Sequence, residues 1–294
     1  MLLNKLIDKA PKIKIENLFT DSRLKVDKGM FFCIKGMIND GHRFVSEAIN
    51  NGAVCVVHSD DLEEYVDDIV YIKVVDVQNI LISVADKFYD HVSSKLKIFG
   101  VTGTNGKTSI AITIKSILNK YLTCGYIGTM GIEYNNIHMS TGKTTPDILF
   151  MSKTLSDMNK DEVKAVTIEV SSHGLDQRRI DGIEFDYAIF TNLTHEHLDY
   201  HGTMENYFEA ELDSSKCAII NVDDDYGKRL IQMTDARVVT YGIDNSATYQ
   251  AIDIKLDSKN TSFTLRHANE DYAISTNLVA KFNVYNLLAI IAAL

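Results

Sequence analysis

A strand-like segment that runs straight into a glycine-rich loop and then into a helix constrains this chain more than any other feature. Lys97–Val101 is apolar, the letters TGTNGKTS follow, and Lys107–Tyr121 has helical character. A strand, a tight loop and a helix in this order are the context in which a glycine-rich loop binds phosphate. The segment therefore predicts a phosphate-binding loop.

Each residue type in this loop suits phosphate. Gly103 and Gly106 let the backbone turn tightly and aim N–H groups at phosphate oxygens, and the helix N-terminus adds partial positive charge. Lys107 can reach the β- and γ-phosphates, and the hydroxyl of Thr108 can bind Mg²⁺. The strict pattern requires glycine where this chain has Val101, so the loop is a variant. The alternative is a glycine-rich strand–helix turn with a chance lysine.

Strand-like and helix-like segments alternate through most of the chain, which favours parallel sheets covered by helices. The predicted strands are Met30–Ile34, Ala53–His58, Tyr71–Val75, Lys97–Val101, Cys124–Ile127, Val163–Val170, Phe185–Phe190, Cys217–Asn221 and Val238–Gly242. The predicted helices are His42–Asn51, closed by Gly52, then Val77–Ser94, Lys107–Tyr121 and Phe282–Leu294. Polar alternation from Thr248 to Ser275 predicts antiparallel strands at an edge of the second sheet. The predicted fold class is α/β, with a small N-terminal α/β domain (residues 1–95) and a central P-loop-type ATPase domain with a parallel sheet (residues 96–294).

The composition excludes several classes of protein. The chain has 294 residues, 45% hydrophobic and 24% charged, and a net charge of −10 with histidine neutral. This acidic balance argues against non-specific binding to nucleic acid or to an anionic membrane. No apolar stretch approaches the roughly eighteen residues of a membrane span, and no signal peptide is evident, so we expect no membrane insertion and a cytoplasmic location. The cysteines Cys33, Cys55, Cys124 and Cys217 are too widely spaced for a CxxC metal or redox pair, and three of them lie in apolar runs, which predicts buried thiols in a reducing compartment.

Longer motifs connect the loop to a known family. TGTNGKTS resembles the ATP loop of the Mur ligases, which build the peptide stem of bacterial cell-wall precursors. The other matching motifs are TDSR (20–23), FFCIKG and DGHRF (31–44), TTPD (144–147), EVSSHGLDQRR (169–179), FTNLTHEHLDYHGTMENYF (190–208) and FNVYN (282–286). Together they are most similar to the branch that adds the third amino acid, the UDP-N-acetylmuramoyl-tripeptide synthetases, over essentially the whole chain.

The resemblance implies an ATP-dependent amide ligase of peptidoglycan synthesis. ATP would phosphorylate the terminal carboxylate of UDP-N-acetylmuramoyl-L-alanyl-D-glutamate, and an amino group would then attack the acyl phosphate. The implied cofactors are ATP and Mg²⁺. The implied partners are the UDP-sugar dipeptide and a diamino acid, which is either lysine or meso-diaminopimelate. The sequence does not indicate the oligomeric state.

The residues implied by the resemblance fall into four groups. The catalytic group is Lys107, Glu169 and His197. The ATP contacts are Gly103, Thr104, Asn105, Gly106, Lys107, Thr108, Ser109 and Asn283. The contacts to the UDP-sugar peptide are Thr144, Thr145, Ser171, Gln177 and Arg179, with Ser22 at the uridine diphosphate in an N-terminal UDP-sugar-binding domain. The metal ligands are Thr108, Glu169, His197 and Glu211.

Some of these residues also have structural interpretations. A strand-end glutamate such as Glu169 is by itself more often a solvated charge, and a lone histidine such as His197 is more often structural. Asn283 could equally cap the last helix. Asp199 and His201 lie within a motif but have no assignable role.

Two departures from the family pattern bear on activity. Glu211 stands where the family has a lysine, usually carbamylated, that binds a second Mg²⁺. Glu211 could supply the carboxylate directly, or the second metal site could be lost. The family also carries a third domain after the helix at which this sequence ends, so we expect weak or no turnover by this polypeptide alone.

Other function classes compete with the ligase. A binding module that holds only the UDP-sugar peptide or ATP is the main alternative. A ligase that extends folate with glutamate shares the loop but not TDSR or SSHGLDQRR. An unrelated phosphate-loop kinase lacks support from any second-substrate motif.

Overall fold

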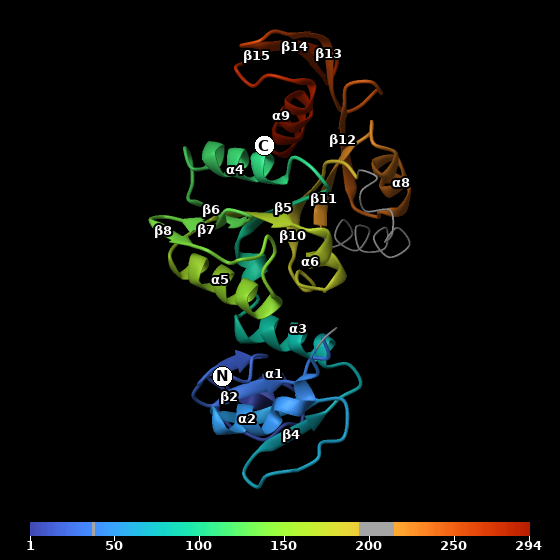
Figure 1. Ribbon diagram of the computed structural model, residues 1–294. Helices are drawn as coiled ribbons and strands as arrows, with labels where there is room; N and C mark the ends of the chain where they lie inside the picture. Colours follow the sequence, from blue (N-terminus) through green and yellow to red (C-terminus); the bar gives the residue numbers. More distant parts are fainter. Residues whose placement is uncertain (37–38, 194–214) are drawn as a thin grey trace. The chain divides into compact units, whose positions relative to one another are not determined.

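The computed structural model describes residues 1–36, 39–193 and 215–294 (Figure 1). Within these ranges the chain forms two compact units. The N-terminal unit comprises Met1–Val92 and Ile148–Lys153, and the central unit comprises Ser93–Asp147 and Thr154–Leu294. In the part of the chain that the structure describes, every helix is too short or too polar to cross a membrane.

A four-stranded parallel sheet, in the order β1-β2-β3-β4, forms the N-terminal unit. Its elements are α1 (Leu3–Leu6), β1 (Asn17–Phe19), β2 (Gly29–Phe32), the 3-10 turn η1 (Gly41–Phe44), α2 (Val45–Asn50), β3 (Ala53–His58), β4 (Val70–Lys73) and α3 (Val77–Phe88). Phe31 of β2 packs with Phe19, Val45 and Val56 in the core of the unit. Gly52 follows α2 with a φ of +104°, which confirms the predicted glycine closure.

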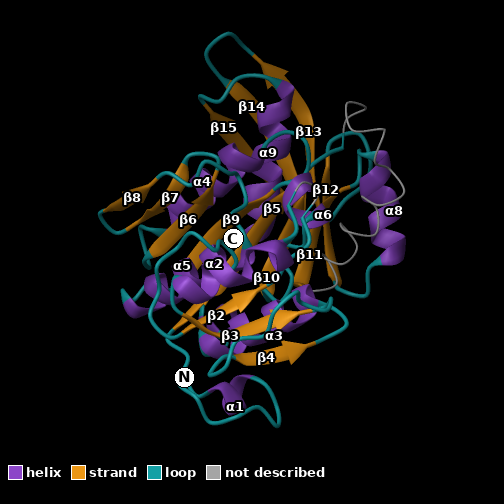
Figure 2. Ribbon diagram, turned by 60° about the horizontal axis from the view of Figure 1, so that its bottom comes forward, coloured by secondary structure: helices purple, strands orange, loops and turns teal. Residues whose placement is uncertain are grey.

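An eleven-stranded sheet forms the central unit, in the order β15-β14-β13-β12-β11-β10-β5-β9-β6-β7-β8 (Figure 2). Its strands are β5 (Lys97–Thr102), β6 (Cys124–Gly128), β7 (Gly131–Tyr134), β8 (Ile137–Met139), β9 (Ala165–Val170), β10 (Phe185–Phe190), β11 (Ser215–Asn221), β12 (Arg237–Gly242), β13 (Tyr249–Leu256), β14 (Thr261–His267) and β15 (Glu270–Thr276). Its helices are α4 (Lys107–Leu118), α6 (Ser172–Asp176), α8 (Asp225–Met233) and α9 (Lys281–Ala293). The 3-10 turn η2 (Val92–Lys95) and α5 (Ile148–Lys160) each contribute residues to both units.

The middle of this sheet is entirely parallel, from β12 through β5 to β6, which confirms the predicted α/β class. The strand β5 lies between β9 and β10. The loop that follows β5 therefore stands near the centre of the carboxyl edge of the sheet, where ligands bind in open α/β sheets.

Antiparallel strands extend the sheet at both ends. The predicted antiparallel strands over 248–275 are confirmed for β14 and β15, but β13 pairs parallel with β12 and antiparallel with β14. At the other end the predicted strand β6 continues into β7 and β8 as an antiparallel meander, and neither β7 nor β8 was predicted. Gly131, with a φ of +100°, lies at the turn into β7.

Several predicted boundaries were wrong by a few residues. The helix predicted over Val77–Ser94 ends at Phe88, because Asp90 and His91 adopt the left-handed region, with φ of 59° and 52°, and break it. The helix predicted over His42–Asn51 is a 3-10 turn followed by α2. Side-chain capping by Asp40, which accepts the N–H of His42 at 3.0 Å, starts that turn.

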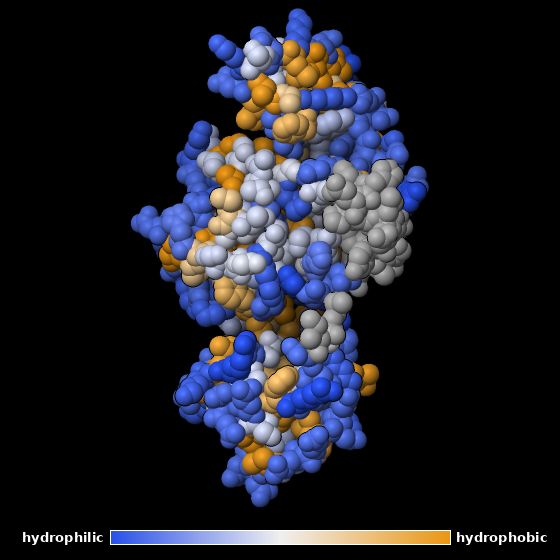
Figure 3. Space-filling view, in the orientation of Figure 1, coloured by the Kyte–Doolittle hydropathy of each residue, from blue (hydrophilic) through white to orange (hydrophobic). Residues whose placement is uncertain are grey.

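The helices α4 and α9 pack on each other and on the sheet of the central unit. Ile110 and Ile114 of α4 are fully buried in the same core as Val284 and Leu288 of α9. This packing places Asn286 in the second turn of α9 beside Gly106 in the loop that precedes α4. Figure 3 shows hydrophobic surface where β13–β15 and α9 lie, and Phe282 at the start of α9 is 65% exposed.

The four cysteines are free and buried, which confirms the prediction from their surroundings. Burial raises the pKa of Cys33, Cys55 and Cys124 to about 12. These thiols are therefore protonated at neutral pH and are poor nucleophiles.

Candidate functional site

Two glycines shape the loop between β5 and α4. Gly103 has a φ of +121° and Gly106 a φ of +92°, conformations that L side chains rarely adopt. A Cβ on Gly103 would overlap Thr191 Oγ1, and a Cβ on Gly106 would lie 2.6 Å from Asn286 Oδ1. Glycine is therefore required at both positions by backbone conformation and by close neighbours.

The end of β10 supports the loop through Thr191 and Asn192. The N–H of Thr104 donates to Asn192 O at 2.7 Å, and the N–H of Asn105 donates to Asn192 Oδ1 at 3.1 Å. Thr191 Oγ1 donates to Asn105 O at 2.7 Å. Two loop N–H groups are thus directed at Asn192, and the groups left for an anion are the N–H groups of the first turn of α4, which have no intrahelical partner.

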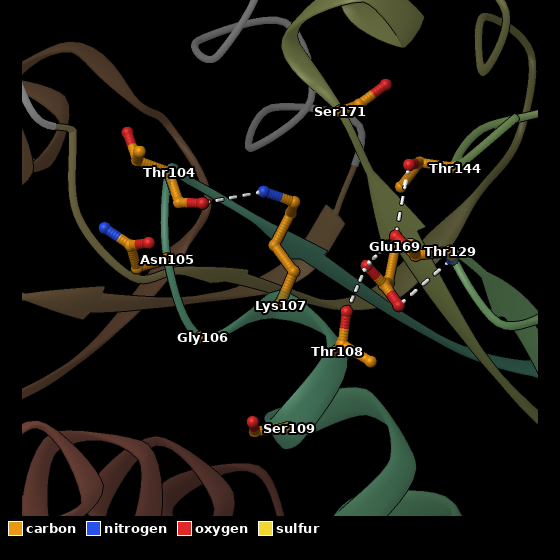
Figure 4. Close-up of a pocket in the computed structure, with 10 residues that line it drawn as sticks. All are labelled: Thr104, Asn105, Gly106, Lys107, Thr108, Ser109, Thr129, Thr144, Glu169 and Ser171. Atoms are coloured by element: carbon orange, nitrogen blue, oxygen red, sulfur yellow. Dashed lines mark hydrogen bonds between the residues drawn. The ribbon is translucent and has the colours of Figure 1, made fainter. Parts of the chain in front are cut away.

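Lys107 reaches back over the loop and donates to Gly103 O at 2.5 Å and to Thr104 O at 3.0 Å (Figure 4). Burial lowers the pKa of this lysine, and the charge of Glu169 partly offsets that effect. The ammonium borders a cavity of about 400 Å³. The residues that line this cavity are Thr104, Asn105, Gly106, Lys107, Thr108, Ser109, Thr129, Thr144, Glu169 and Ser171.

Glu169 faces Lys107 across the cavity from the end of β9, and it is fully buried. Its Oε1 accepts the hydroxyl of Tyr126 and the N–H of Thr129, the latter at 3.3 Å. Its Oε2 accepts the hydroxyls of Thr108 at 2.9 Å and Thr129 at 3.0 Å. A buried carboxylate costs much less free energy when its oxygens are hydrogen-bonded, and four donors serve that role here.

Tyr126 and Gly128 on β6 complete the surroundings of this carboxylate. Burial, and then the hydrogen bond to Glu169, raise the pKa of the Tyr126 phenol, so it remains a donor at neutral pH. A Cβ on Gly128 would overlap both Glu169 Oε1 and the Tyr126 hydroxyl. The strand therefore approaches Glu169 closely because residue 128 has no side chain.

A wall of hydroxyl groups stands beside Glu169. Thr144 Oγ1 lies 3.1 Å from Thr129 Oγ1, and Thr145 Oγ1 donates to the main-chain oxygen of Glu169 at 2.9 Å. Ser171 Oγ lies 3.0 Å from Thr145 Oγ1. Thr144 and Ser171 line the cavity, whereas Thr145 is buried behind them.

The predicted pair Gln177 and Arg179 lies next to this wall but does not line the cavity. Arg179 Nη1 donates to Thr145 O at 2.7 Å, and Arg179 Nη2 donates to Gln177 Oε1 at 2.5 Å. The guanidinium is therefore anchored to the backbone behind the hydroxyl wall.

The remaining predicted residues have separate surroundings. Ser22 belongs to the N-terminal unit, where its hydroxyl donates to Glu47 Oε2 at 2.5 Å. Asn283 Nδ2 donates to Val279 O at 2.7 Å, so its side-chain amide binds the backbone just before α9. The asparagine beside Gly106 is instead Asn286. His197 and Glu211, together with Asp199 and His201, lie outside the described residues.

Comparison with known proteins identifies the family. Residues 101–294 match the family described as the Mur ligase middle domain. The chain belongs to the Mur ligase family. It is 42% identical over 289 residues to the UDP-N-acetylmuramoyl-L-alanyl-D-glutamate--2,6-diaminopimelate ligase of Halalkalibacterium halodurans, covering 95% of this chain and 59% of that protein.

A second relative of this Mur ligase chain is UDP-N-acetylmuramyl-tripeptide synthetase 2 of Oceanobacillus iheyensis, 39% identical over 299 residues, with 98% of this chain and 61% of that protein covered. Among solved structures, a UDP-N-acetylmuramoyl-L-alanyl-D-glutamate--2,6-diaminopimelate ligase matches with a TM-score of 0.84 and 28% identity, covering 100% of this chain and 63% of that one. The chain thus spans about three fifths of the length of these relatives.

Sequence reasoning missed three residues at the site of this Mur ligase chain: Tyr126, Thr129 and Asn192. Tyr126 and Thr129 belong to the strand and turn next to β9 on the sheet. Polar residues at the carboxyl end of a strand adjacent to Glu169 were a usable signal. Asn192 lies inside the quoted motif that begins at Phe190, but its contact with the loop depends on the pairing of β10 with β5, which the sequence does not specify.

A cluster in the N-terminal unit has the composition of a metal site but not its chemistry. One ligand atom each from Asp40, His42 and Asp60 lie within 4.8 Å of one another. His42 Nδ1 pairs with Asp40 Oδ1 at 2.6 Å, while its Nε2 accepts the N–H of Ser59 at 3.0 Å. Asp60 Oδ2 pairs with Lys35 at 2.6 Å. Both ring nitrogens are occupied, so the cluster holds the backbone turn together.

Proposed function

We propose that this chain is an ATP-dependent amide ligase that adds the third amino acid to UDP-N-acetylmuramoyl-L-alanyl-D-glutamate in peptidoglycan synthesis. The observation that carries the proposal is a single cavity that joins a phosphate-binding loop, a buried carboxylate and a hydroxyl wall. A ligase that makes an acyl phosphate must bring a nucleotide phosphate and a substrate carboxylate together. The names of the relatives support the same reaction.

The nucleotide side of the cavity is the loop with the first turn of α4. Thr104, Asn105 and Gly106 form the loop, and the N–H groups of Lys107, Thr108 and Ser109 would bind phosphate oxygens. Lys107 would leave Gly103 O and Thr104 O to pair with the β- and γ-phosphates. Asn283 and its neighbour Asn286 on α9 would lie near the adenine.

The residues between loop and wall fit Mg²⁺. The hydroxyl of Thr108 and the carboxylate of Glu169 are hard oxygen donors, already 2.9 Å apart, and Mg²⁺ prefers such ligands. When bound, Mg²⁺ neutralises phosphate charge and favours phosphoryl transfer. His197 and Glu211 are further ligands of the proposal and belong to the segment outside the described residues.

The substrate side is the hydroxyl wall with Arg179 behind it. Thr144, Thr145, Ser171, Gln177 and Arg179 would hold the dipeptide so that its terminal carboxylate points at the γ-phosphate. A carboxylate oxygen attacks the γ-phosphorus and ADP leaves. The amine of the incoming amino acid then attacks the acyl carbon and inorganic phosphate leaves.

The proposal assigns a ligand to each of the two predicted domains. Residues 1–95 would bind the UDP-sugar, with Ser22 at the diphosphate, and residues 96–294 would hold ATP and the dipeptide. The third amino acid is proposed to be 2,6-diaminopimelate rather than lysine, supported by the printed name of the relative that is 42% identical. The reaction is placed in the cytoplasm, where ATP is available.

Binding of each substrate and phosphate release together test the proposal. Purified chain is titrated with UDP-N-acetylmuramoyl-L-alanyl-D-glutamate and with ATP·Mg²⁺ by calorimetry. Phosphate release is then measured with diaminopimelate, with lysine and with neither. We expect both ligands to bind, and we expect the weak phosphate release that the sequence allows for this polypeptide to depend on diaminopimelate.

Controls separate the ligase from the binding-module alternative. Lys107→Ala should abolish phosphate release and weaken ATP binding while leaving the UDP-sugar dipeptide bound. Binding of both ligands by a folded chain without any phosphate release would favour the binding module. Failure of the UDP-sugar dipeptide to bind would eliminate both the ligase and the binding module as functions of this site.

A further inference from the structure

Hydrogen bonds around Glu169 fix the direction in which the hydroxyls of the cavity donate (Figure 4). A carboxylate only accepts, so Thr129 Oγ1 donates its single hydrogen to Glu169 Oε2, 3.0 Å away. In the 3.1 Å contact between Thr129 and Thr144, the donor must therefore be Thr144. Thr144 thus faces the cavity with oxygen lone pairs, and its one hydrogen is already committed.

Thr145 and Ser171 form a second chain with the same direction. Thr145 Oγ1 donates to the main-chain oxygen of Glu169 at 2.9 Å, and a carbonyl oxygen also only accepts. Ser171 must therefore donate its hydroxyl hydrogen to Thr145 over 3.0 Å. Ser171 Oγ also accepts the N–H of Gly174 at 3.1 Å. What Ser171 offers to a ligand is again a lone pair.

Two sides of the cavity consequently differ in polarity. Lys107 supplies only donors, which suit phosphate and carboxylate oxygens. The pair Thr144 and Ser171, here called the acceptor wall, supplies only acceptors. An anionic oxygen placed against the acceptor wall would meet lone pairs with no hydrogen between them, whereas an N–H group would be matched.

We propose that the Thr144 oxygen of the acceptor wall binds a peptide N–H group of the substrate and that Thr129 is the positioning residue that sets the polarity of Thr144. The inference rests on the proposed function for the identity of the substrate, a UDP-sugar dipeptide, which carries such N–H groups. Thr129 acts through Thr144, because its oxygen takes up the Thr144 hydrogen. Without the Thr129 hydroxyl, Thr144 is free to donate or to accept.

The test compares the UDP-sugar dipeptide with two analogues, in each of which one peptide N–H is replaced by an ester oxygen. Dissociation constants are measured by calorimetry on the 294-residue chain without nucleotide or divalent metal, so that Glu169 keeps its four donors. We expect one ester to bind the wild-type chain roughly threefold to tenfold more weakly than the amide, the size of one hydrogen bond.

Three variants assign that difference to Thr129. Thr129→Val keeps the shape but removes the hydroxyl, and we expect the ratio of ester to amide dissociation constants to fall to within about twofold of unity. Thr129→Ser should restore the wild-type ratio. Thr240→Val is the matched control, because its hydroxyl pairs with Thr248 away from the cavity.

The ratio distinguishes the polarity of the wall from general damage. A purely structural defect in Thr129→Val weakens the amide and the ester equally and leaves the ratio unchanged, and that result overturns the inference. Equal binding of amide and both esters to the wild-type chain overturns it as well. A wild-type chain that binds none of the three ligands overturns the proposed function and the inference with it.

Discussion

Thr108 donates its hydroxyl hydrogen to Glu169 over 2.9 Å, although the two residues are 61 positions apart in the chain. The contact joins the first turn of α4 to the end of β9 across the cavity. It brings a hydroxyl and a carboxylate to the separation that two ligands of one small cation require. The same contact keeps the carboxylate satisfied while the protein is free of ligand.

Replacement of Glu169 by glutamine tests this dual role. Glu169→Gln puts an NH₂ group among hydroxyl donors, so we expect the free energy of unfolding to fall by about 1–3 kcal/mol. Because Glu169 is a proposed ligand of Mg²⁺, its replacement should also weaken binding of Mg²⁺·ATP by about tenfold or more, the scale of losses at metal sites. Denaturant unfolding and calorimetry measure the two effects. Glu184→Gln, at an exposed position, should change neither.

Gly128 lies so close to Glu169 that any side chain should disturb the site. A Cβ there would overlap Glu169 Oε1 and the Tyr126 hydroxyl, so we expect Gly128→Ala to lower the free energy of unfolding by about 1–3 kcal/mol. Binding of Mg²⁺·ATP should weaken in parallel. The control is Gly142→Ala, where nothing lies within 4 Å of the added Cβ and the cost is confined to a φ of +64°. Equal effects of the two substitutions on nucleotide binding would contradict the prediction.

Asp223 links the segment after β12 to α9 through five donors. Its carboxylate accepts the backbone N–H groups of Ile243 at 2.6 Å, Asp244 at 2.9 Å and Asn245 at 2.8 Å. It also accepts the side-chain amide of Asn245 at 2.7 Å and the hydroxyl of Tyr285 at 2.9 Å. Burial alone would raise the pKa of Asp223, but these donors outweigh it and hold the pKa below the ordinary value of 3.8. A carboxyl whose pKa is depressed on folding stabilises the protein above its unfolded pKa and loses that contribution as pH falls through the folded value.

Replacement of Asp223 by asparagine should therefore have a pH-dependent effect. At pH 7 we expect Asp223→Asn to lower the free energy of unfolding by about 1.5–3 kcal/mol, the range for hydrogen bonds to a charged group. The difference in the free energy of unfolding between wild type and Asp223→Asn should become smaller as pH falls from about 5 to about 3. Urea unfolding across this range is the measurement. Asp225→Asn is the control, because that side chain is 89% exposed, and a gap for Asp223→Asn that widens on acidification would refute the assignment.

Ala280, immediately before α9, has a backbone conformation that favours glycine. Its φ of 80° and ψ of 147° lie near a region used almost only by glycine. We expect Ala280→Gly to raise the free energy of unfolding by about 0.5–2 kcal/mol, because relief of strain exceeds the added flexibility of the unfolded chain. Thermal unfolding measures the change. Ala292→Gly, inside α9, should shift stability in the opposite direction by about 1 kcal/mol.

The sequence predicted the part of the fold that depends on local pattern. Apolar runs such as Ala53–His58 and Phe185–Phe190 form strands with the predicted bounds, because buried parallel strands consist of continuous apolar residues. The meander after β6 was not predicted, because the stretch from Gly131 to Met139 mixes polar and apolar residues without a clear period.

The site was harder to predict than the fold because its contacts join distant strands. Motifs indicated Lys107 and Glu169, and the structure brings them to opposite sides of one cavity. Thr129 has no motif of its own, and its position follows from the pairing of β6 with β9. Asn192 contacts the loop only because β10 pairs with β5. Such neighbours depend on strand order, which local periodicity does not encode.

The central place of β5 in its sheet has a consequence for synthesis of the chain on the ribosome. Gly100 of β5 pairs with Ile168 on one side and Ala188 on the other, and both partners are translated much later. Non-local pairing of this kind is slow, and a nascent chain exposes its unpaired strands until the partners emerge. The loop after β5 therefore reaches its final geometry only after the segment through Asn192 has left the exit tunnel, so binding of a phosphate-containing ligand to this loop cannot assist the folding of shorter nascent chains.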